Sequence, residues 1–263
     1  FILPFVVHCV PVIYMKKQFQ GSIALLVATF IWGTAFVAQS VGMDHLGPMT
    51  FQAIRSLLAV LALLPVTARM NRAPGAFLPA WKAKGLWKTG ILCGLALFVA
   101  QGLQQMGLQY TEPGKAGFIT AMYIVLVPIL GIFLGKRPTP ACWLSVGLAV
   151  AGLYLLSCMG VTQINRGDLL IMGCALAFAV QINCIDHFCE GLDGFRMNCI
   201  QALTVAVISI PFVWGTETVD VGNLMACWGP LCFAGCLSMG LAYSLQIIGQ
   251  KHMEATAASL IMS

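Results

Sequence analysis

Residues 21–41 read GSIALLVATFIWGTAFVAQSV, an apolar run without a single charged side chain. A helix rises about 1.5 Å per residue, so a run of this length crosses the roughly 30 Å hydrocarbon core of a bilayer. The run has a second copy, GDLLIMGCALAFAVQINCIDH, at residues 167–187, at a constant shift of 146 residues. The two copies align without a gap as far as Pro65 and Pro211, so the chain repeats a pair of predicted membrane spans.

A second block repeats at a shift of 142 residues. Identical apolar residues are weak evidence for a repeat, because apolar segments match each other easily. Three other identical pairs are stronger evidence: Gln104, Gly107 and Glu112 fall on Gln246, Gly249 and Glu254. Each copy is predicted to contain five helices, and an odd number makes the second copy enter the membrane from the opposite side. Two inverted repeats are typical of secondary transporters, whose substrate site lies at the repeat interface.

The composition indicates a membrane protein. Hydrophobic residues make up 59% of the chain and charged residues 9%, whereas soluble domains carry about 25% charged residues. We therefore expect an all-α integral membrane protein that contacts the lipid bilayer. The net charge of +5 gives no reason to expect a nucleic-acid partner, because nearly all basic residues lie in predicted loops.

The apolar runs predict helices over 22–41, 49–68, 89–109, 116–135, 141–158, 168–187, 196–214, 225–248 and from 255 onward. The first repeat is expected over residues 15–158 (helices one to five), and the second over residues 167–263 (helices six to eight and the start of nine). The repeat implies ten helices, with the last one and a half missing from this chain. Residues 1–14 precede a Met-Lys-Lys sequence that resembles a natural start. We interpret them as a non-native upstream segment, with an interfacial helix as the alternative.

Lysine and arginine are distributed unevenly between the two sides of this predicted topology. Only Lys115 and Arg166 fall on one side. Eleven fall on the other: Lys16, Lys17, Arg69, Arg72, Lys82, Lys84, Lys88, Lys136, Arg137, Arg196 and Lys251. Cytoplasmic loops carry such an excess. The sequence therefore predicts a multi-pass protein of the cell inner or plasma membrane with a cytoplasmic N-terminus.

Four short segments resemble one known family: ATFIWGTAF at 28–36, FQAIR at 51–55, GLQYT at 107–111 and AGFI at 116–119. They are similar to EamA-type transporters of the drug/metabolite transporter superfamily, and the similarity extends over residues 21–263. The resemblance implies ten helices with both termini in the cytoplasm, and the export or exchange of small metabolites such as amino acids. It also implies a central cavity lined by helices one to four and six to nine.

Arg55 is the only basic residue well inside a predicted span, and its repeat mate is the neutral Gln201. An arginine at a helix centre costs roughly 2.5 to 3.5 kcal/mol on insertion scales, so it should face protein or a water-filled cavity. Its guanidinium could hold a substrate carboxylate through two hydrogen bonds. The alternative is a structural arginine that extends its head group toward the membrane surface.

Uncharged polar side chains are also expected at this cavity. Gln101, Gln104 and Gln105 share one face of the third helix at spacings of three and four residues. Tyr243 and Gln246 offer a similar face in the eighth helix. These side chains either line the cavity or join helices by hydrogen bonds, and the repeat relation of Gln104 and Gln246 favours cavity lining.

Trp32 lies in the middle of the first helix, although tryptophans that anchor a helix at the membrane surface lie near its end. It therefore either lines the cavity or packs between helices. Tyr123, Gln181 and Asn183 are weaker candidates of the same kind.

Catalysis and cofactor binding are not expected. The four histidines are far apart in the sequence and the predicted spans contain almost no carboxylate, so an intramembrane enzyme would lack its acid, base or metal ligands. We expect a secondary or facilitative transporter of a small-molecule substrate that works by alternating access, with no cofactor and no metal. The alternative is a membrane structural or assembly protein without transport activity. The sequence leaves homodimer formation open.

Overall fold

The computed structural model describes residues 3–70, 77–157 and 165–263, and every regular element within these ranges is a helix. Seven helical spans in these ranges are long and apolar enough to cross a membrane: Lys16–Met43, Pro48–Met70, Leu86–Gly107, Pro113–Phe133, Arg166–Phe188, Gly194–Thr216 and Trp228–Gln250. The predicted all-α integral membrane fold is therefore confirmed.

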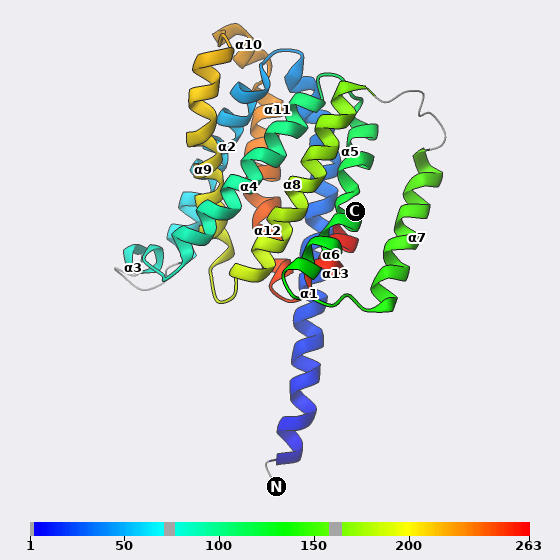
Figure 1. Cartoon of the computed structure of the whole chain (residues 1–263). Coiled ribbons are helices and arrows are strands. Elements are labelled where there is room, and N and C mark those ends of the chain that lie inside the picture. Colours follow the sequence, from blue (N-terminus) through cyan, green and yellow to red (C-terminus); the bar gives the residue numbers. More distant parts are fainter. Residues whose placement is uncertain (1–2, 71–76, 158–164) are drawn as a thin grey trace.

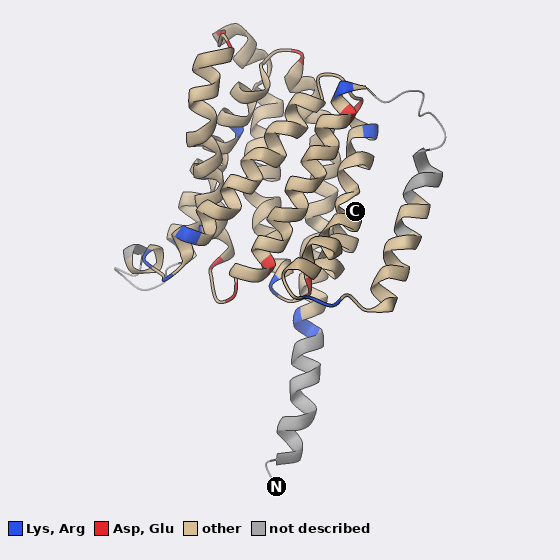
Figure 2. Cartoon of the chain, viewed as in Figure 1, with Lys and Arg blue, Asp and Glu red and all other residues tan. Residues whose placement is uncertain are grey.

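The helices form a bundle, with α7 at its side (Figure 1). In chain order they are α1 (Leu3–Met43), α2 (Pro48–Met70), α3 (Phe77–Trp81), α4 (Leu86–Gly107), α5 (Pro113–Ala121), α6 (Tyr123–Phe133), α7 (Pro140–Ser157), α8 (Arg166–Phe188), α9 (Gly194–Thr216), α10 (Val221–Ala226), α11 (Trp228–Cys232), the π-helix η1 (Phe233–Ala242), α12 (Tyr243–Gln250) and α13 (Ala255–Met262). We call the end that carries α10 the upper face and the end that carries α3 the lower face. Charged residues gather at these two faces, and the middle of the bundle is almost free of them (Figure 2).

Two of the predicted helices are interrupted. The predicted helix 116–135 is made of α5 and α6, which begin earlier, at Pro113, and break at Met122. Proline suits the first helical turn because its missing N–H has no intrahelical partner there. The predicted helix 225–248 consists of α10, α11, η1 and α12. A π-helix has i to i+5 hydrogen bonds and wider turns, which the apolar run does not reveal.

Helix α1 crosses α12 at a pair of glycines. A Cβ atom placed on Gly249 would lie 2.7 Å from the Leu25 side chain and 2.9 Å from the backbone oxygen of Gly21. Any side chain at this position would push the two backbones apart. The absence of a side chain therefore lets the helices approach this closely.

Helix α4 crosses α8 in the same way. A Cβ atom on Gly107 would lie 2.5 Å from the Ile171 side chain and 3.0 Å from the backbone oxygen of Gly167. The residue shifts seen in the sequence relate the two crossings: Gly21 falls on Gly167, Leu25 on Ile171, and Gly107 on Gly249. Figure 1 shows α1 rising from the lower face and α8 descending from the upper face. The sequence repeat thus coincides with a repeat in helix packing.

Helix α2 packs along its repeat mate α9 and also against η1. At the upper face the Glu217 carboxylate, just after α9, accepts hydrogen bonds from the backbone N–H groups of Met49 (2.9 Å) and Thr50 (2.8 Å). At the lower face Arg196 of α9 donates to the Thr67 carbonyl of α2 at 3.5 Å. These bonds satisfy backbone groups near the two ends of α2 and fix the helix in place.

Candidate functional site

A cavity of about 680 Å³ lies within the bundle. Helices α1, α2, α4, α5, α6, α8, η1, α12 and α13 all contribute residues to its wall. At the upper face the wall includes residues 112–115, around the start of α5. The connections at the lower face (134–139, 189–193 and 251–254) contribute no lining residue. The cavity wall therefore reaches the upper face and stops short of the lower connections.

The Arg55 guanidinium lies in the cavity wall, and only 2% of the residue is exposed. Its Nη1 donates to Gln39 Oε1 at 2.5 Å, and the group lies 5.7 Å from the centre of the Phe51 ring. Among the described residues, its Nε and Nη2 find no acceptor and no carboxylate forms an ion pair with it. A buried cation with free donors favours binding of an anion from outside the chain.

Trp32 and Tyr243 form an aromatic part of the wall, with ring centroids 4.9 Å apart and planes inclined by 56°. The Trp32 Nε1 is buried and has no acceptor in the described part of the chain. On α6, the Tyr123 hydroxyl donates to the Met262 carbonyl of α13 at 2.6 Å. This region therefore offers a bound molecule apolar ring faces and one free N–H donor.

Three glutamines supply further polar groups to the wall. The Gln104 Nε2 donates to Thr120 Oγ1 at 3.4 Å. The Gln246 Nε2 donates to Gln181 Oε1 at 3.1 Å. The Oε1 atoms of Gln101 and Gln246 are buried without a donor from any described residue. Two repeat-related helices thus each present an amide oxygen that can accept a hydrogen bond from a bound molecule.

Seven of the ten predicted site residues line the cavity: Trp32, Arg55, Gln101, Gln104, Tyr123, Tyr243 and Gln246. The structure does not bring Gln105, Gln181 or Asn183 to it. Gln105 donates to a carbonyl of α1 and Asn183 to a carbonyl of α6, at 3.3 and 3.1 Å. Gln181 bonds to glutamines of α9 and α12. These three side chains join helices, which is the alternative role considered for the polar residues.

Thr120, Ser238 and Lys115 also line the cavity, although the sequence did not single them out as site residues. Hydroxyls in helices commonly bond to their own backbone, so an isolated threonine or serine in an apolar run carries no clear signal. A lysine in a loop indicates topology, and the place of Lys115 at the cavity mouth follows only from the fold. No group of three His, Cys, Asp or Glu side chains within the described ranges could hold a metal ion.

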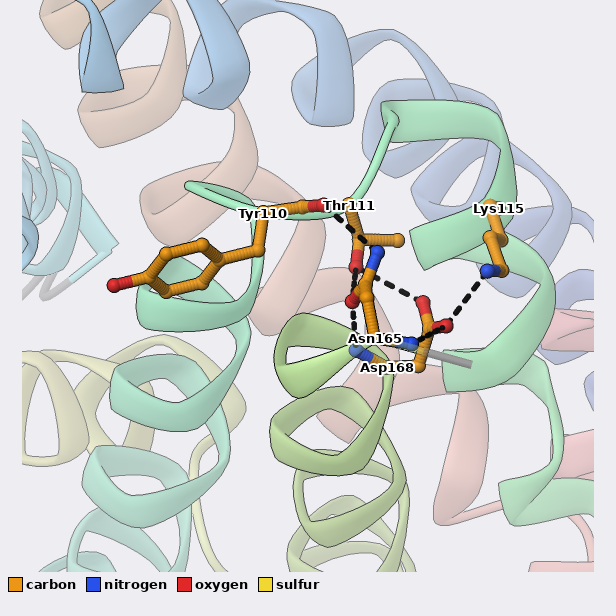
Figure 3. Close-up of polar contacts among 5 residues, drawn as sticks. All are labelled: Tyr110, Thr111, Lys115, Asn165 and Asp168. Atoms are coloured by element: carbon orange, nitrogen blue, oxygen red, sulfur yellow. Dashed lines mark hydrogen bonds and ion pairs between the residues drawn. The ribbon is translucent and has the colours of Figure 1, made fainter. Parts of the chain in front are cut away.

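A hydrogen-bonded cluster braces the mouth of the cavity (Figure 3). Asn165 and Asp168 form a reciprocal cap at the start of α8, in which each side chain accepts the other's backbone N–H at 2.9 Å. The Asp168 carboxylate also accepts from the Thr111 hydroxyl at 2.9 Å and pairs with the Lys115 ammonium at 2.6 Å. The cluster joins the α4–α5 connection to α8 and fixes a lysine at the mouth.

The chain is similar to proteins that are named as transporters. The sequence model of the EamA-like transporter family matches residues 19–158 and, separately, residues 165–263. An "Uncharacterized transporter" of Archaeoglobus fulgidus is 29% identical over 250 residues, which cover 94% of this chain and 75% of that protein. The "Uncharacterized transporter YoaV" of Bacillus subtilis is 24% identical over 258 residues, covering 94% and 84%. A solved crystal structure has the same fold, with a TM-score of 0.70, 19% identity and coverage of 91% and 82%.

Proposed function

The chain belongs to the EamA-like transporter family and is a membrane transporter, and we propose that it exports or exchanges small metabolites bearing a carboxylate, namely amino acids or related compounds. In this proposal the protein moves its substrate across the membrane and does not catalyse a reaction. One observation carries it: the wall of the cavity contains the Arg55 cation, buried, with two guanidinium nitrogens free of partners among the described residues.

A carboxylate is the group that Arg55 fits best. The planar guanidinium can donate two parallel hydrogen bonds to the two oxygens of a carboxylate, a match that a lysine ammonium does not offer. An unneutralised arginine in the middle of a span costs roughly 2.5 to 3.5 kcal/mol on insertion scales. A bound anion would offset part of that cost, because it supplies the missing opposite charge in a region of low dielectric constant.

The remaining groups of the wall suit the other parts of an amino acid. The free Oε1 atoms of Gln101 and Gln246 can accept hydrogen bonds from a substrate ammonium. The rings of Trp32 and Tyr243 offer apolar faces to a side chain and attract a cation through their π-systems. The cavity therefore has complementary groups for both charges of a zwitterion.

We propose that transport follows alternating access between two inverted repeats, residues 15–158 and 167–263, with residues 1–14 belonging to neither. The excess of lysine and arginine supports a lower face in the cytoplasm of the cell inner or plasma membrane. In this orientation the cavity wall reaches the outer side of the membrane. A cysteine at the exposed Lys84 should then be shielded from an impermeant thiol reagent in intact cells, whereas one at the exposed His45 should react. The reverse pattern would contradict this orientation.

The carboxylate proposal is tested by substituting Arg55. Purified protein is reconstituted into amino-acid-loaded proteoliposomes, and the uptake of a panel of labelled amino acids is measured. Hydrogen bonds between charged groups contribute roughly 1.5 to 3 kcal/mol, so Arg55→Gln should reduce uptake about tenfold to a hundredfold. Arg55→Lys should retain part of the uptake because it keeps the charge but loses the two-point grip.

A matched control is Arg69→Gln, the same change at an exposed position in the last turn of the same helix. It should leave uptake unchanged. Uptake by Arg55→Gln at the level of the unmodified protein would assign Arg55 a structural role. Failure of the unmodified protein to carry any member of the panel would favour the alternative of a membrane assembly protein.

A further inference from the structure

The lower end of the bundle contains an ionic contact that joins three separate segments. The Asp186 carboxylate, near the end of α8, accepts a hydrogen bond through Oδ1 from the backbone N–H of Ala255 at 2.9 Å. Its Oδ2 forms an ion pair with the Lys136 ammonium of the α6–α7 connection. The Asp186 side chain is 12% exposed and that of Lys136 34%. One carboxylate thus ties α8 to the first residue of α13 and to the chain that leaves α6.

This contact lies at the end of the bundle that the cavity wall does not reach. Helix α13 packs against both α6 and α8, and residues of all three helices line the cavity. The wall contains residues 112–115 of the upper face but none from the lower connections 134–139 and 251–254. The contact of Asp186 with Ala255 and Lys136 therefore lies beyond the lower end of the cavity wall.

The residues at the repeat-related positions, near the upper face, cannot form the same hydrogen bond. The two sequence shifts relate Asp186 to Ser40 and Ala255 to Pro113. Proline has no backbone N–H to donate, and the serine hydroxyl carries no charge. Pro113 lies instead in the cavity wall at the upper face. At the upper face Asp168 of α8 pairs instead with Lys115, which itself lines the cavity, so the hydrogen bond between Asp186 and Ala255 has no repeat-related counterpart there.

From this asymmetry we propose that Asp186 is the latch that holds the lower end of the cavity closed, and that its release from Ala255 and Lys136 lets the cavity open toward the lower face. The inference rests on the proposed alternating access, which requires each end to open in turn. A contact that holds the lower end closed, with no repeat-related counterpart at the upper end, favours the state in which the lower end is closed. Removing the latch should therefore shift the population toward the state that opens at the lower face.

Two cysteine reporters can follow this shift in purified protein that otherwise lacks cysteine. Ala258→Cys reports on the lower end, because Ala258 is fully buried in α13 and is not part of the cavity wall. Gly117→Cys reports on the upper end, because Gly117 lines the cavity and a Cβ there meets only the Phe36 ring, at 3.8 Å. The rate of reaction with a water-soluble maleimide is measured for each reporter.

The latch is removed by Asp186→Ser, which copies the repeat mate. Loss of hydrogen bonds to a charged group should raise the labelling rate of Ala258→Cys by about tenfold or more, and the rate of Gly117→Cys should fall. Lys136→Met, which removes only the ion pair, should move both rates in the same directions by less. Glu190→Ser, which removes an exposed carboxylate from the neighbouring α8–α9 connection, should change neither.

The opposite response of the two reporters separates a latch from a general structural role. A faster reaction at both positions would indicate that the fold has loosened, and would overturn the proposal. An unchanged rate at Ala258→Cys would overturn it as well. The labelling experiment needs no substrate, so it tests the latch separately from the proposed substrate. If the two reporters responded in opposite directions but the protein transported none of the tested amino acids, the proposed substrate would be wrong and the latch would still be supported.

Discussion

Arg55 gives the two halves of the cavity different chemistry. The guanidinium is carried by α2, and its hydrogen-bond partner Gln39 belongs to α1. The repeat mate Gln201 is uncharged, and its Oε1 accepts a hydrogen bond from Gln181 at 3.3 Å, which joins α9 to α8. Repeat-related positions therefore serve different purposes: one leaves free donors in a cavity, and the other contributes to helix packing.

The contact glycines provide a test at the scale of single residues. Gly249→Ala should destabilise the protein, because the new methyl group would meet the Leu25 side chain at 2.7 Å and the Gly21 backbone oxygen at 2.9 Å. Overpacking of this kind costs roughly 1 to 3 kcal/mol. Gly107→Ala, at the repeat-related crossing, should do the same. The measurement is the midpoint of thermal unfolding in detergent.

Gly33→Ala is the control for both glycines. A Cβ atom at Gly33 meets nothing within 4 Å, and alanine is favoured over glycine in a helix by roughly 0.5 to 1 kcal/mol. The midpoint of thermal unfolding of Gly33→Ala should stay the same or rise. If Gly249→Ala and Gly107→Ala unfolded at the same temperature as this control, the close helix crossings would not contribute to stability.

Some of these residue roles could be read from the sequence and others could not. The position of Arg55 was visible because a charge inside an apolar run stands out in any membrane span. The sequence did not show that Gln104 and its neighbour Gln105 point in different directions. Gln104 lines the cavity, whereas Gln105 bonds to α1. Neighbouring helical positions point about 100° apart, and the packing of the whole bundle decides which of them faces the cavity.

At the level of elements, η1 is a part of the second repeat whose backbone differs from that of the first. Its counterpart, residues 91–100 of α4, is a regular α-helix. A Cβ atom on Gly235 of η1 would lie 2.8 Å from the backbone oxygen of Arg55, so η1 packs directly on α2 at the residue that carries the cation. The backbone difference and the charge difference between the repeats thus occur at the same place. Apolar periodicity could not predict η1, because it does not distinguish an α-helix from a π-helix in a uniformly apolar run.

Asn198 of α9 should be needed for the stability of η1. Its Nδ2 donates to the carbonyls of Met239 (2.9 Å) and Gly240 (2.8 Å) at the end of the π-helix. Asn198→Ala would leave these buried carbonyls without that donor, at a cost of roughly 1 to 3 kcal/mol. Faster amide hydrogen exchange in residues 233–245 is the expected result. The control is Asn223→Ala, an exposed position in α10. Equal exchange in both variants would exclude this role for Asn198.

At the scale of the molecule, the sequence predicted the membrane fold and the two matched blocks, because both depend on patterns visible in one chain. Among the identical residue pairs of the two blocks, the glycines Gly107 and Gly249 relate directly to the packing, because their small size lets helices approach closely. The face of the bundle that the cavity wall reaches could not be predicted from the sequence. That property depends on contacts between segments that are distant in the sequence, such as the contact of Asp186 with Ala255. Local sequence patterns do not predict such contacts.

If the proposed function holds, the cavity binds the carboxylate of a small metabolite. The most direct test measures counterflow in proteoliposomes, comparing each transported amino acid with its amide and with the amine that lacks the carboxyl group. Because Arg55 supplies free donors to an anion, the amino acid should exchange, and both analogues should exchange at least about tenfold more slowly. Equal exchange of the amino acid and its amide would contradict the claim.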